Sequence, residues 1–496
     1  MKKFNNVIKG TLILTTAGIL SKILGFFYRI YLSRCIGAAG MGLFQIVMPA
    51  AGIVFAICSS GIQTAISKFC CDKKNDFLWL ISGLLLSIPT SLILTFIVYT
   101  NADFIATRFI LNEACSSLLK ILSLSFPFAA FHNCINGFYF AKKKTAIPAF
   151  SQLFEQIIRF CAVYIYVTIY ASDGNASVLC AIYSNLFGQI ASFLYCTCAI
   201  FYTFIKSKYN NTHKNSSLMS KIREMFKFSF PLTANRLLMH IFQSAEAVLV
   251  PAQLIVYGLS KSDSVSIYGI LTGMAMPLIL FPTALTNSLA VMLLPAVSEL
   301  NLENNNKSIK STINKCITFC ISTGVLSTAI FIFYGSYAGA IVFNQPEVRN
   351  YVCILAWLCP FIYLTVTMGS ILNGLGETTA IQNISGIIVR LIFLVILVPK
   401  YGITMYMAGL LCSQILVCIC HYIKLSRMLH IRMNAHGWFL IPGFFSFLST
   451  GISLIFYKYI SRLVSGLIPL FGGAVTACII YIFLYATFYP YRNKPH

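Results

Sequence analysis

Charged side chains are scarce in this chain. They make up 10% of its 496 residues, and only 13 residues are Asp or Glu, whereas soluble domains carry about 25% charged residues. Hydrophobic residues make up 58%, and the mean hydropathy is +0.80. A chain this apolar would not stay dispersed in water, so its expected solvent is lipid and the soluble classes are excluded.

Motifs of soluble enzymes are also missing. The sequence has no phosphate-binding Walker loop, so ATP hydrolysis is not expected. The acidic residues of the predicted outer loops stand alone, and no Ser-His-Asp set or carboxylate pair is arranged for catalysis. No connection exceeds about 25 residues, which leaves no room for a soluble catalytic domain. We therefore expect no enzyme, no catalytic residue, no cofactor and no metal site.

Long apolar stretches fill almost the whole chain, and each could cross a bilayer, for which a helix needs about 20 residues. The fourteen predicted spans are 8–32, 41–66, 77–99, 117–140, 147–170, 176–204, 228–252, 266–298, 313–335, 350–373, 379–399, 403–423, 437–457 and 464–489. No small-residue cleavage site follows the first stretch, so it is predicted to be a retained helix. The expected fold class is an all-α polytopic membrane protein.

The basic residues indicate an orientation. With the N-terminus inside, 23 of the 36 Lys and Arg fall in inside segments and 7 in outside segments. This bias supports fourteen spans in the cytoplasmic (cell) membrane with both termini cytoplasmic. A basic face against anionic lipid headgroups accounts for the net charge of +23, so no nucleic-acid partner is expected.

The two halves of the chain repeat a pattern. Pro127 and Pro360 are each followed by Asn-Gly, then Thr-Ala-Ile, and finally an aliphatic pair with Arg159 or Arg390. Secondary transporters are commonly built from such repeats, with the substrate held between them and access alternating. The expected division is an N-terminal bundle at 1–204, a cytoplasmic linker at 205–227, a C-terminal bundle at 228–435, and two further helices with a short tail at 436–496.

Cations interrupt the apolar spans. In the first span, a polar stripe recurs every three or four residues and so lies on one helical face; it consists of Thr15, Gly18, Lys22, Gly25, Arg29 and Ser33. A central Lys or Arg costs at least about 2.5–3.5 kcal/mol on insertion scales. The alternative explanation is that Lys22 and Arg29 extend to the headgroups.

Two further spans carry similar stripes. The seventh holds Thr233, Arg236, His240, Gln243 and Glu246, and the fifth holds Glu155, Gln156 and Arg159. Arg236 can reach His240, whereas Glu246 is nearly three turns away. The structural alternatives are pairing of Glu246 with Lys22 or Arg29, a self-satisfied Glu155–Arg159 pair, and Arg390 as a cation at the leaflet edge.

The sign of these charges discriminates between substrates. The deep cations are Lys22, Arg29, Arg159, Arg236 and Arg390, and they outnumber Glu155 and Glu246. A positive balance in a site of low dielectric constant favours phosphate, pyrophosphate or carboxylate. A carrier for cationic drugs would be expected to show the opposite balance.

Several runs of this sequence resemble the stage V sporulation protein B family. They are Gly10–Leu14, Lys22–Ile30, Gly40–Gln45, Ser151-Gln152 with Glu155-Gln156 and Arg159, Pro231–Arg236 with Gln243, Glu246 and Pro251, Tyr268–Pro277, Phe281-Pro282, Leu285–Leu289, Leu294–Glu299 and Asn373–Gly376. Together they extend over essentially the full length. That family belongs to the polysaccharide-flippase branch of the MOP superfamily, beside MurJ-type lipid II flippases and MATE exporters.

The resemblance implies two bundles around a V-shaped cavity lined by spans 1, 2, 7 and 8. It implies export of an undecaprenyl-pyrophosphate-linked saccharide, such as the lipid II precursor of spore-cortex peptidoglycan. Lys22, Arg29 and Arg236 match its basic cavity positions and are predicted to hold the pyrophosphate. Thr233, His240, Gln243, Glu246, Glu155, Gln156, Arg159 and Arg390 are predicted to line the cavity or to take part in coupling.

Other functions remain open at this point. The partners expected for a flippase are the lipid-linked glycan, membrane lipids and cell-wall synthesis enzymes, with coupling to a Na⁺ or H⁺ gradient or to the membrane potential. The alternatives are a MATE-like exporter of organic cations, a membrane-bound glycan polymerase or ligase, and a non-transporting scaffold for wall synthesis.

Overall fold

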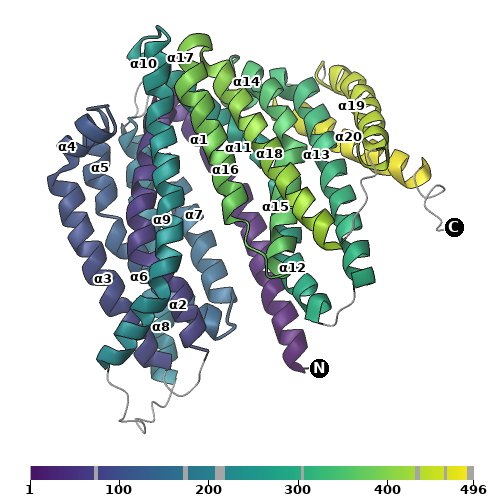
Figure 1. The fold of residues 1–496 in the computed structure, drawn as a ribbon. Helices are drawn as coiled ribbons and strands as arrows, with labels where there is room; N and C mark the ends of the chain where they lie inside the picture. The colour runs from purple at the N-terminus through teal and green to yellow at the C-terminus, as the bar shows by residue number, and fades with distance from the viewer. Residues whose placement is uncertain are drawn as a thin grey trace. The chain divides into compact units, whose positions relative to one another are not determined.

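The computed structural model describes residues 2–71, 76–170, 177–206, 218–302, 306–429, 436–462 and 466–488, and most of their side chains from residue 16 onward. Every regular element in these ranges is a helix (Figure 1). Residues 207–217 of the predicted linker at 205–227 and residues 489–496 of the C-terminal tail lie outside the described residues, as does the first residue of the chain.

Close contacts divide the chain into two compact units. The first unit runs to Ala252 and includes Lys261–Gly269, and the second consists of Gln253–Ser260 and the chain from Ile270 onward. The boundary expected at 205–227 stays a prediction, and by close contacts the seventh predicted span lies with the first half. The reason is close packing at glycines: a side chain at Gly61 would lie 2.6 Å from the carbonyl oxygen of Ser229.

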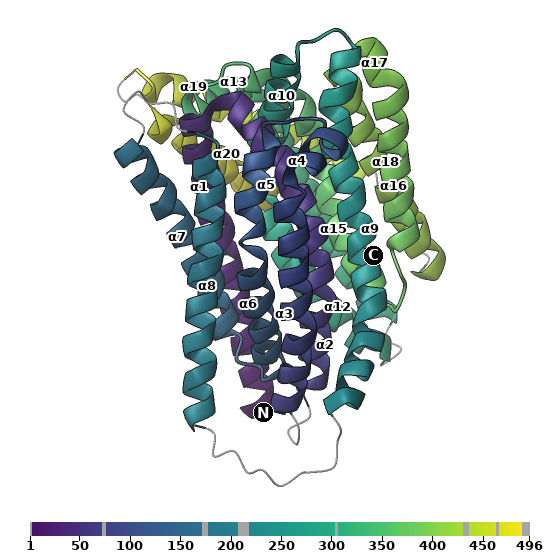
Figure 2. The same ribbon diagram turned by 90° about the vertical axis from the view of Figure 1, so that its left-hand side faces the viewer.

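The first unit is built from the first half of the chain and two later helices. Its elements are α1 (Lys2–Phe55), the π-helical turn η1 (Ala56–Ser60), α2 (Gly61–Phe69), α3 (Asp76–Thr100), α4 (Ala102–Phe104), η2 (Ile105–Phe109), α5 (Cys115–Ser123), α6 (Phe126–Ala141), α7 (Ala146–Tyr170), α8 (Leu179–Lys206), most of α9 (Leu218–Val256) and α10 (Lys261–Gly269). Figure 2 shows α3, α6 and α8 running side by side.

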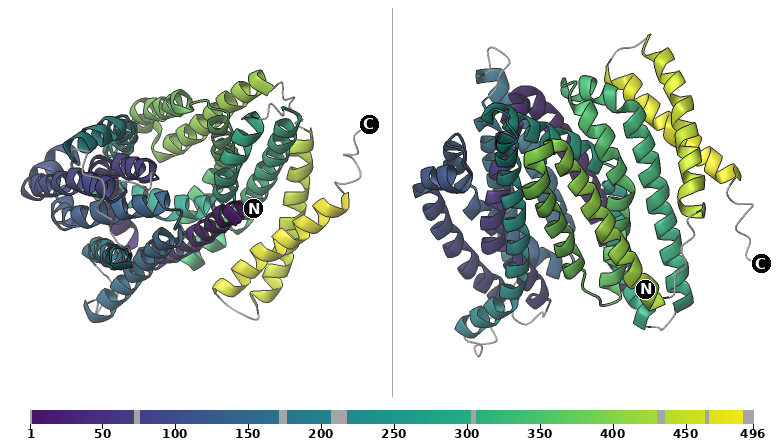
Figure 3. Two further views of the ribbon diagram at one scale, coloured as in Figure 1. Left: turned by 90° about the horizontal axis from the view of Figure 1, so that it is seen from below. Right: turned by 45° about the horizontal axis from the view of Figure 1, so that its top comes forward.

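The second unit holds the remaining helices. They are η3 (Ile270–Ala275), α11 (Met276–Leu280), α12 (Thr283–Leu302), α13 (Asn306–Phe343), α14 (Val348–Leu355), η4 (Ala356–Leu358), α15 (Cys359–Gly374), α16 (Ala380–Ile392), η5 (Phe393–Leu397), α17 (Val398–Tyr401), α18 (Ile403–Leu429), η6 (His436–Leu440), α19 (Ile441–Ile460) and α20 (Leu467–Phe488). The last two helices pack against each other and against α13 (Figure 3).

The protein is a multi-pass membrane protein. Within the described residues, 12 helices are long and apolar enough to cross a membrane, or 13 if α5 and α6, bent by 45°, form one span. The number fourteen therefore stays a prediction. The first two predicted spans, 8–32 and 41–66, are joined in one long helical stretch that bends at Gly37, whose φ of 68° suits glycine.

The predicted eighth span, 266–298, is wrong as a single helix. It is interrupted at Phe281–Pro282, between α11 and α12. Proline has no backbone N–H and cannot continue the helical hydrogen-bond ladder. The hydroxyl of Thr283 donates back to the carbonyl of Leu280, 2.5 Å away, at this break.

The sequence repeat has a structural counterpart in each unit. Helices α6 and α15 both contain 16 residues, and both have proline as the second residue, Pro127 and Pro360. Each follows a short helix and precedes the helix that carries the repeated arginine, α7 or α16. The packing repeats as well, because α6 and α7 contact α8 just as α15 and α16 contact α18.

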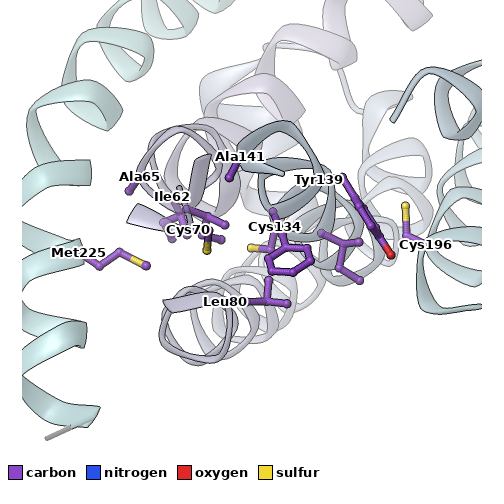
Figure 4. Packing of buried hydrophobic residues seen from close by; sticks show 12 residues of the cluster. Ile62, Ala65, Cys70, Leu80, Cys134, Tyr139, Ala141, Cys196 and Met225 are labelled. Atoms are coloured by element: carbon purple, nitrogen blue, oxygen red, sulfur yellow. The ribbon is translucent and has the colours of Figure 1, made fainter. Parts of the chain in front are cut away.

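An apolar cluster holds the first unit together at one end. It joins α2, α3, α6, α8 and α9 through Ile62, Leu80, Cys134, Tyr139, Cys196 and Met225, among others (Figure 4). Each of these six is at most 6% exposed. Met225 is completely buried here, so the start of α9 is part of the core of the first unit.

Candidate anion-binding site

The first span presents two cations, Lys22 and Arg29, on α1. Lys22 is exposed and Arg29 is half-buried on α1. Among the described residues neither makes a salt bridge or a hydrogen bond. The expected alternative of a pair with Glu246 is therefore not found for either one. The polar stripe of α1 faces α7, since a side chain at Gly25 would contact Oε1 of Gln156 at 3.7 Å.

Arg236 holds its place on α9 by bonding to neutral groups. Its Nη1 donates to the carbonyl of Ser60 at 2.7 Å, and its Nη2 donates to Oγ1 of Thr64 at 3.3 Å. The guanidinium is exposed. Arg236 thus bonds to Ser60 and Thr64 and not to His240, which its helical spacing would have allowed it to reach. Dipoles position this arginine without cancelling its charge, so it can still attract an anion.

Two other predicted residues of α9, Thr233 and His240, lie close to glycines of the first unit. A side chain at Gly61 would collide with Thr233, and one at Gly52 would lie 2.7 Å from Nδ1 of His240. Thr233 and His240 thus fit against glycines of the first unit. The Nδ1 atom of His240 is buried, and it has no hydrogen-bond partner in the described part of the chain.

Glu155 and Arg159 form the salt bridge that their spacing predicts. Arg159 contacts Oε1 of Glu155 one turn away on α7, with the two side chains 18% and 14% exposed. Arg159 also donates to Oδ1 of Asn185 on α8 at 3.5 Å. Its side chain occupies the space beside Gly188, where a Cβ would lie 2.6 Å from its Cγ.

A buried hydrogen-bond network extends from Glu155 to two other helices. Gln189 on α8 donates from Nε2 to Glu155 at 2.9 Å. The one hydroxyl proton of Ser192 faces both the main-chain carbonyl of Ser151 at 3.1 Å and the other carboxylate oxygen of Glu155 at 3.3 Å. The Oε1 atom of Gln189 lies 2.7 Å from Nε2 of His132 on α6. Because that oxygen can only accept, His132 carries its proton on Nε2. The carboxylate is thus satisfied from within the first unit.

The hydrogen-bond partners of Glu155 on α8 were not predicted from the sequence. The signal was present: Asn185, Gln189 and Ser192 recur at steps of four and three, which places three polar groups on one face of an apolar helix. His132 has a polar neighbour at the helical spacing of four, Asn136, whose Nδ2 lies 3.4 Å from its Nδ1.

Three of the predicted site residues remain, Gln243, Glu246 and Arg390. Gln243 is exposed and Glu246 is half-buried, both on α9. Arg390 lies on α16 in the second unit, with a buried Nε. The roles predicted for these three stay predictions.

The first unit therefore has an excess of positive charge. Glu155 on α7 is paired with Arg159 and accepts from Gln189, whereas Lys22, Arg29 and Arg236 have no carboxylate partner among the described residues. Unpaired charges are expensive in a medium of low dielectric constant. A mobile anion with several oxygens would offset that cost, and arginine suits such oxygens because it offers paired donors.

Comparison with known proteins decides the family. A profile described as "Polysaccharide biosynthesis protein" matches residues 7–301, which is more than half of the chain. The chain belongs to the polysaccharide biosynthesis protein family.

Two relatives from Bacillus subtilis are similar to this chain over most of its length. Stage V sporulation protein B of Bacillus subtilis (strain 168) is 24% identical over 97% of this chain and 95% of its own length. The lipid II flippase MurJ of the same organism is 23% identical over 78% of this chain and 76% of its own length. A solved structure, lipid II flippase MurJ in an inward closed conformation, matches with a TM-score of 0.70 at 15% identity, covering 96% of this chain and 99% of that one.

These comparisons confirm the resemblance to the stage V sporulation protein B family and the flippase branch of the MOP superfamily. They also confirm the fold class, because the MurJ structure matches along nearly the whole of both chains. With a lipid flippase among its relatives, this member of the polysaccharide biosynthesis protein family belongs with transporters and not with enzymes.

Proposed function

We propose that the protein is a flippase that moves an undecaprenyl-pyrophosphate-linked saccharide, the lipid II precursor of spore-cortex peptidoglycan, across the cell membrane by alternating access. The pyrophosphate would bind Lys22, Arg29 and Arg236, and the lipid tail would stay in the bilayer. The observation that carries this proposal is that these three cations have no carboxylate partner among the described residues.

The chemistry of the three groups supports a pyrophosphate. Arg29 and Arg236 each offer a planar fork of N–H donors, and Lys22 adds a compact charge. One hydrogen bond to a charged group contributes about 1.5–3 kcal/mol. A diphosphate has enough oxygens to accept from all three side chains, whereas a single carboxylate has two.

A MATE-like exporter of organic cations is the rival, and it needs an available carboxylate. Glu155 is already paired, because its charge is neutralised by the salt bridge to Arg159 and it accepts a hydrogen bond from Gln189. Glu246 is the other candidate acid, and within the flippase proposal it tunes the charge of the site or carries a coupling H⁺ or Na⁺. Loss of dye resistance on Glu246→Gln would favour the rival.

Reconstitution tests the proposal. The purified chain is placed in liposomes with labelled lipid II, and the label that reaches the opposite leaflet is measured for the wild type, for Arg29→Ala with Arg236→Ala, and for Lys458→Gln. Loss of two charged contacts should slow transport roughly 100-fold or more. The matched control removes an exposed lysine of the second unit and should transport normally. Full transport by the double variant would reject the cationic site.

The finer assignments belong to the same proposal. They are a cytoplasmic location of both termini, service to the spore cortex, and contact with wall-synthesis enzymes. Protease protection of tags at either end of the chain tests the orientation. Complementation of a strain without stage V sporulation protein B tests the cortex assignment.

A further inference from the structure

The first unit has a cavity whose lining includes none of the three cations. This cavity of about 370 Å³ opens where the turn between α6 and α7 meets the last turns of α8. Its lining includes Lys144 from the turn. The last two and a half turns of α8 contribute four side chains, those of Cys198, Ala199, Tyr202 and Thr203. No carboxylate is among its lining residues.

One side of the cavity is apolar and packs against the core of the first unit. Ile147, Tyr195 and Ala199 line it, and the same three residues pack against the buried cluster of α2, α3, α6, α8 and α9 (Figure 4). Tyr139 of that cluster is completely buried, and its hydroxyl lies 2.8 Å from Oγ1 of Thr203 in the cavity wall. The cavity can therefore receive an apolar group without rearrangement of the core.

The mouth of the cavity is positive, because Lys144 is among its lining residues and no carboxylate is. The hydroxyl proton of Thr203 is already donated to the carbonyl of Ala199 at 3.0 Å. The ammonium of Lys144 is exposed, and it has no ion pair or side-chain hydrogen bond in the part of the chain that the structure describes. Lys206 lies 5.9 Å from the centre of the Tyr202 ring and adds a second cation. A negatively charged group would satisfy these donors.

The turn that carries Lys144 has another lysine, Lys143, at a position whose backbone conformation favours glycine. The N–H groups of Lys143 and Lys144 donate to the carbonyls of Phe140 and Tyr139 at 3.0 Å each, which is the Schellman ending of a helix. Lys143 occupies its left-handed position with a φ of 57°, where glycine is usual. A non-glycine residue there costs roughly 1–2 kcal/mol.

The cavity lies where two spans end. The candidate spans Ala146–Ile169 and Leu179–Lys206 have their first and last turns at this place. The headgroup region of a bilayer begins at the ends of spans, and tyrosines are enriched there. Basic pockets between spanning helices are a known way of holding anionic headgroups.

We propose that this cavity binds an anionic phospholipid, with the headgroup phosphate on Lys144 and the apolar part on Ile147, Tyr195 and Ala199. Lys143 and Lys206 supply further positive charge at the mouth. The site is independent of the transported lipid, because it uses none of the three cations assigned to transport. It would fix the first unit to the lipid leaflet at the ends of α7 and α8.

Native mass spectrometry of the full chain in detergent tests this site. Phosphatidylglycerol and phosphatidylcholine are titrated separately, and the apparent Kd of the first bound lipid is measured. Lys144→Gln should weaken phosphatidylglycerol binding roughly five-fold, the loss expected for one basic residue at a lipid surface. Cys198→Trp, which fills the exposed mouth, should weaken binding of the same lipid without changing any charge.

Two further variants make the test specific. Lys143→Gly removes a charge while providing the residue that the turn favours, so it should bind less phosphatidylglycerol without loss of thermal stability. Lys458→Gln removes an exposed lysine of the second unit and should leave the affinity unchanged. Equal affinity in Lys144→Gln and Lys458→Gln would overturn the proposal. Complete displacement of the lipid by inorganic phosphate would assign the cavity to free phosphate instead, and would also overturn it.

Discussion

Arg236 on α9 donates a hydrogen bond to the main-chain carbonyl of Ser60, 2.7 Å away in a π-helical turn. The hydroxyl of Thr64 donates to the same carbonyl at 3.2 Å and accepts from the second guanidinium nitrogen. The arginine is thus fixed by a small closed set of neutral groups. These bonds fix the orientation of the guanidinium, and because the groups are neutral they leave its positive charge able to attract an anion.

Arg236→Lys is expected to retain charge and lose function in part. Lysine has no planar fork, so it cannot bond Ser60 and Thr64 together while facing a diphosphate. We expect lipid II transport in liposomes to fall roughly ten-fold, which corresponds to the loss of one hydrogen bond of about 1.4 kcal/mol. Transport as low as that of Arg236→Ala would show that the charge alone contributes little.

Gly269→Ala is expected to loosen the packing of α10 on α1. A Cβ at Gly269 would lie 2.9 Å from Cα of Gly42 and closer still to the carbonyl of Ala38, and backbone atoms cannot move aside cheaply. Such overpacking costs about 1–3 kcal/mol. The thermal midpoint of the purified protein should fall.

Gly451→Ala is the control for that substitution. A Cβ at this helical glycine of α19 meets nothing within 4 Å. Its thermal midpoint should stay level or rise, because alanine is the better helix former by up to about 1 kcal/mol. Equal losses in the two variants would show that close approach at Gly269 is not the cause.

Glu155→Gln should destabilise the first unit. The substitution leaves the mostly buried guanidinium of Arg159 without its carboxylate, for a cost of about 1–3 kcal/mol. Glu155→Gln combined with Arg159→Gln should cost less than the sum of the single changes, which a double-mutant cycle on thermal stability measures. Strict additivity would mean that the two side chains do not interact energetically.

Asp103 provides a pH test outside the spans. The hydrogen bond from Ser116, followed by that from Lys120 at 2.9 Å, lowers the pKa of this carboxyl below its usual 3.8. A lowered pKa gives stability that is present above the unfolded-state value and is lost as pH falls through the native one. The thermal-midpoint difference between wild type and Asp103→Asn should therefore stay constant from about pH 7 to pH 5. A difference that vanishes by pH 5 would contradict this.

Much of the fold could be predicted from local properties of the sequence. Apolar length predicted the spans, and the spacing of Glu155 and Arg159 predicted their salt bridge. The bonds of Arg236 to Ser60 and Thr64 could not be predicted, because they join positions 176 and 172 residues apart. Periodicity assigns residues to a face of one helix, but only tertiary packing decides which helix that face meets. For the same reason the position of α9 in the first unit did not follow from the polar linker before it.

The most direct measurement is binding of lipid II to the purified protein. The Kd is determined in detergent for the wild type, for the triple variant Lys22→Gln, Arg29→Gln and Arg236→Gln, and for Lys458→Gln. The account predicts that the triple variant binds at least roughly 100-fold more weakly and that Lys458→Gln binds like the wild type. Equal affinity of all three proteins would contradict the claim that these cations hold an anionic headgroup.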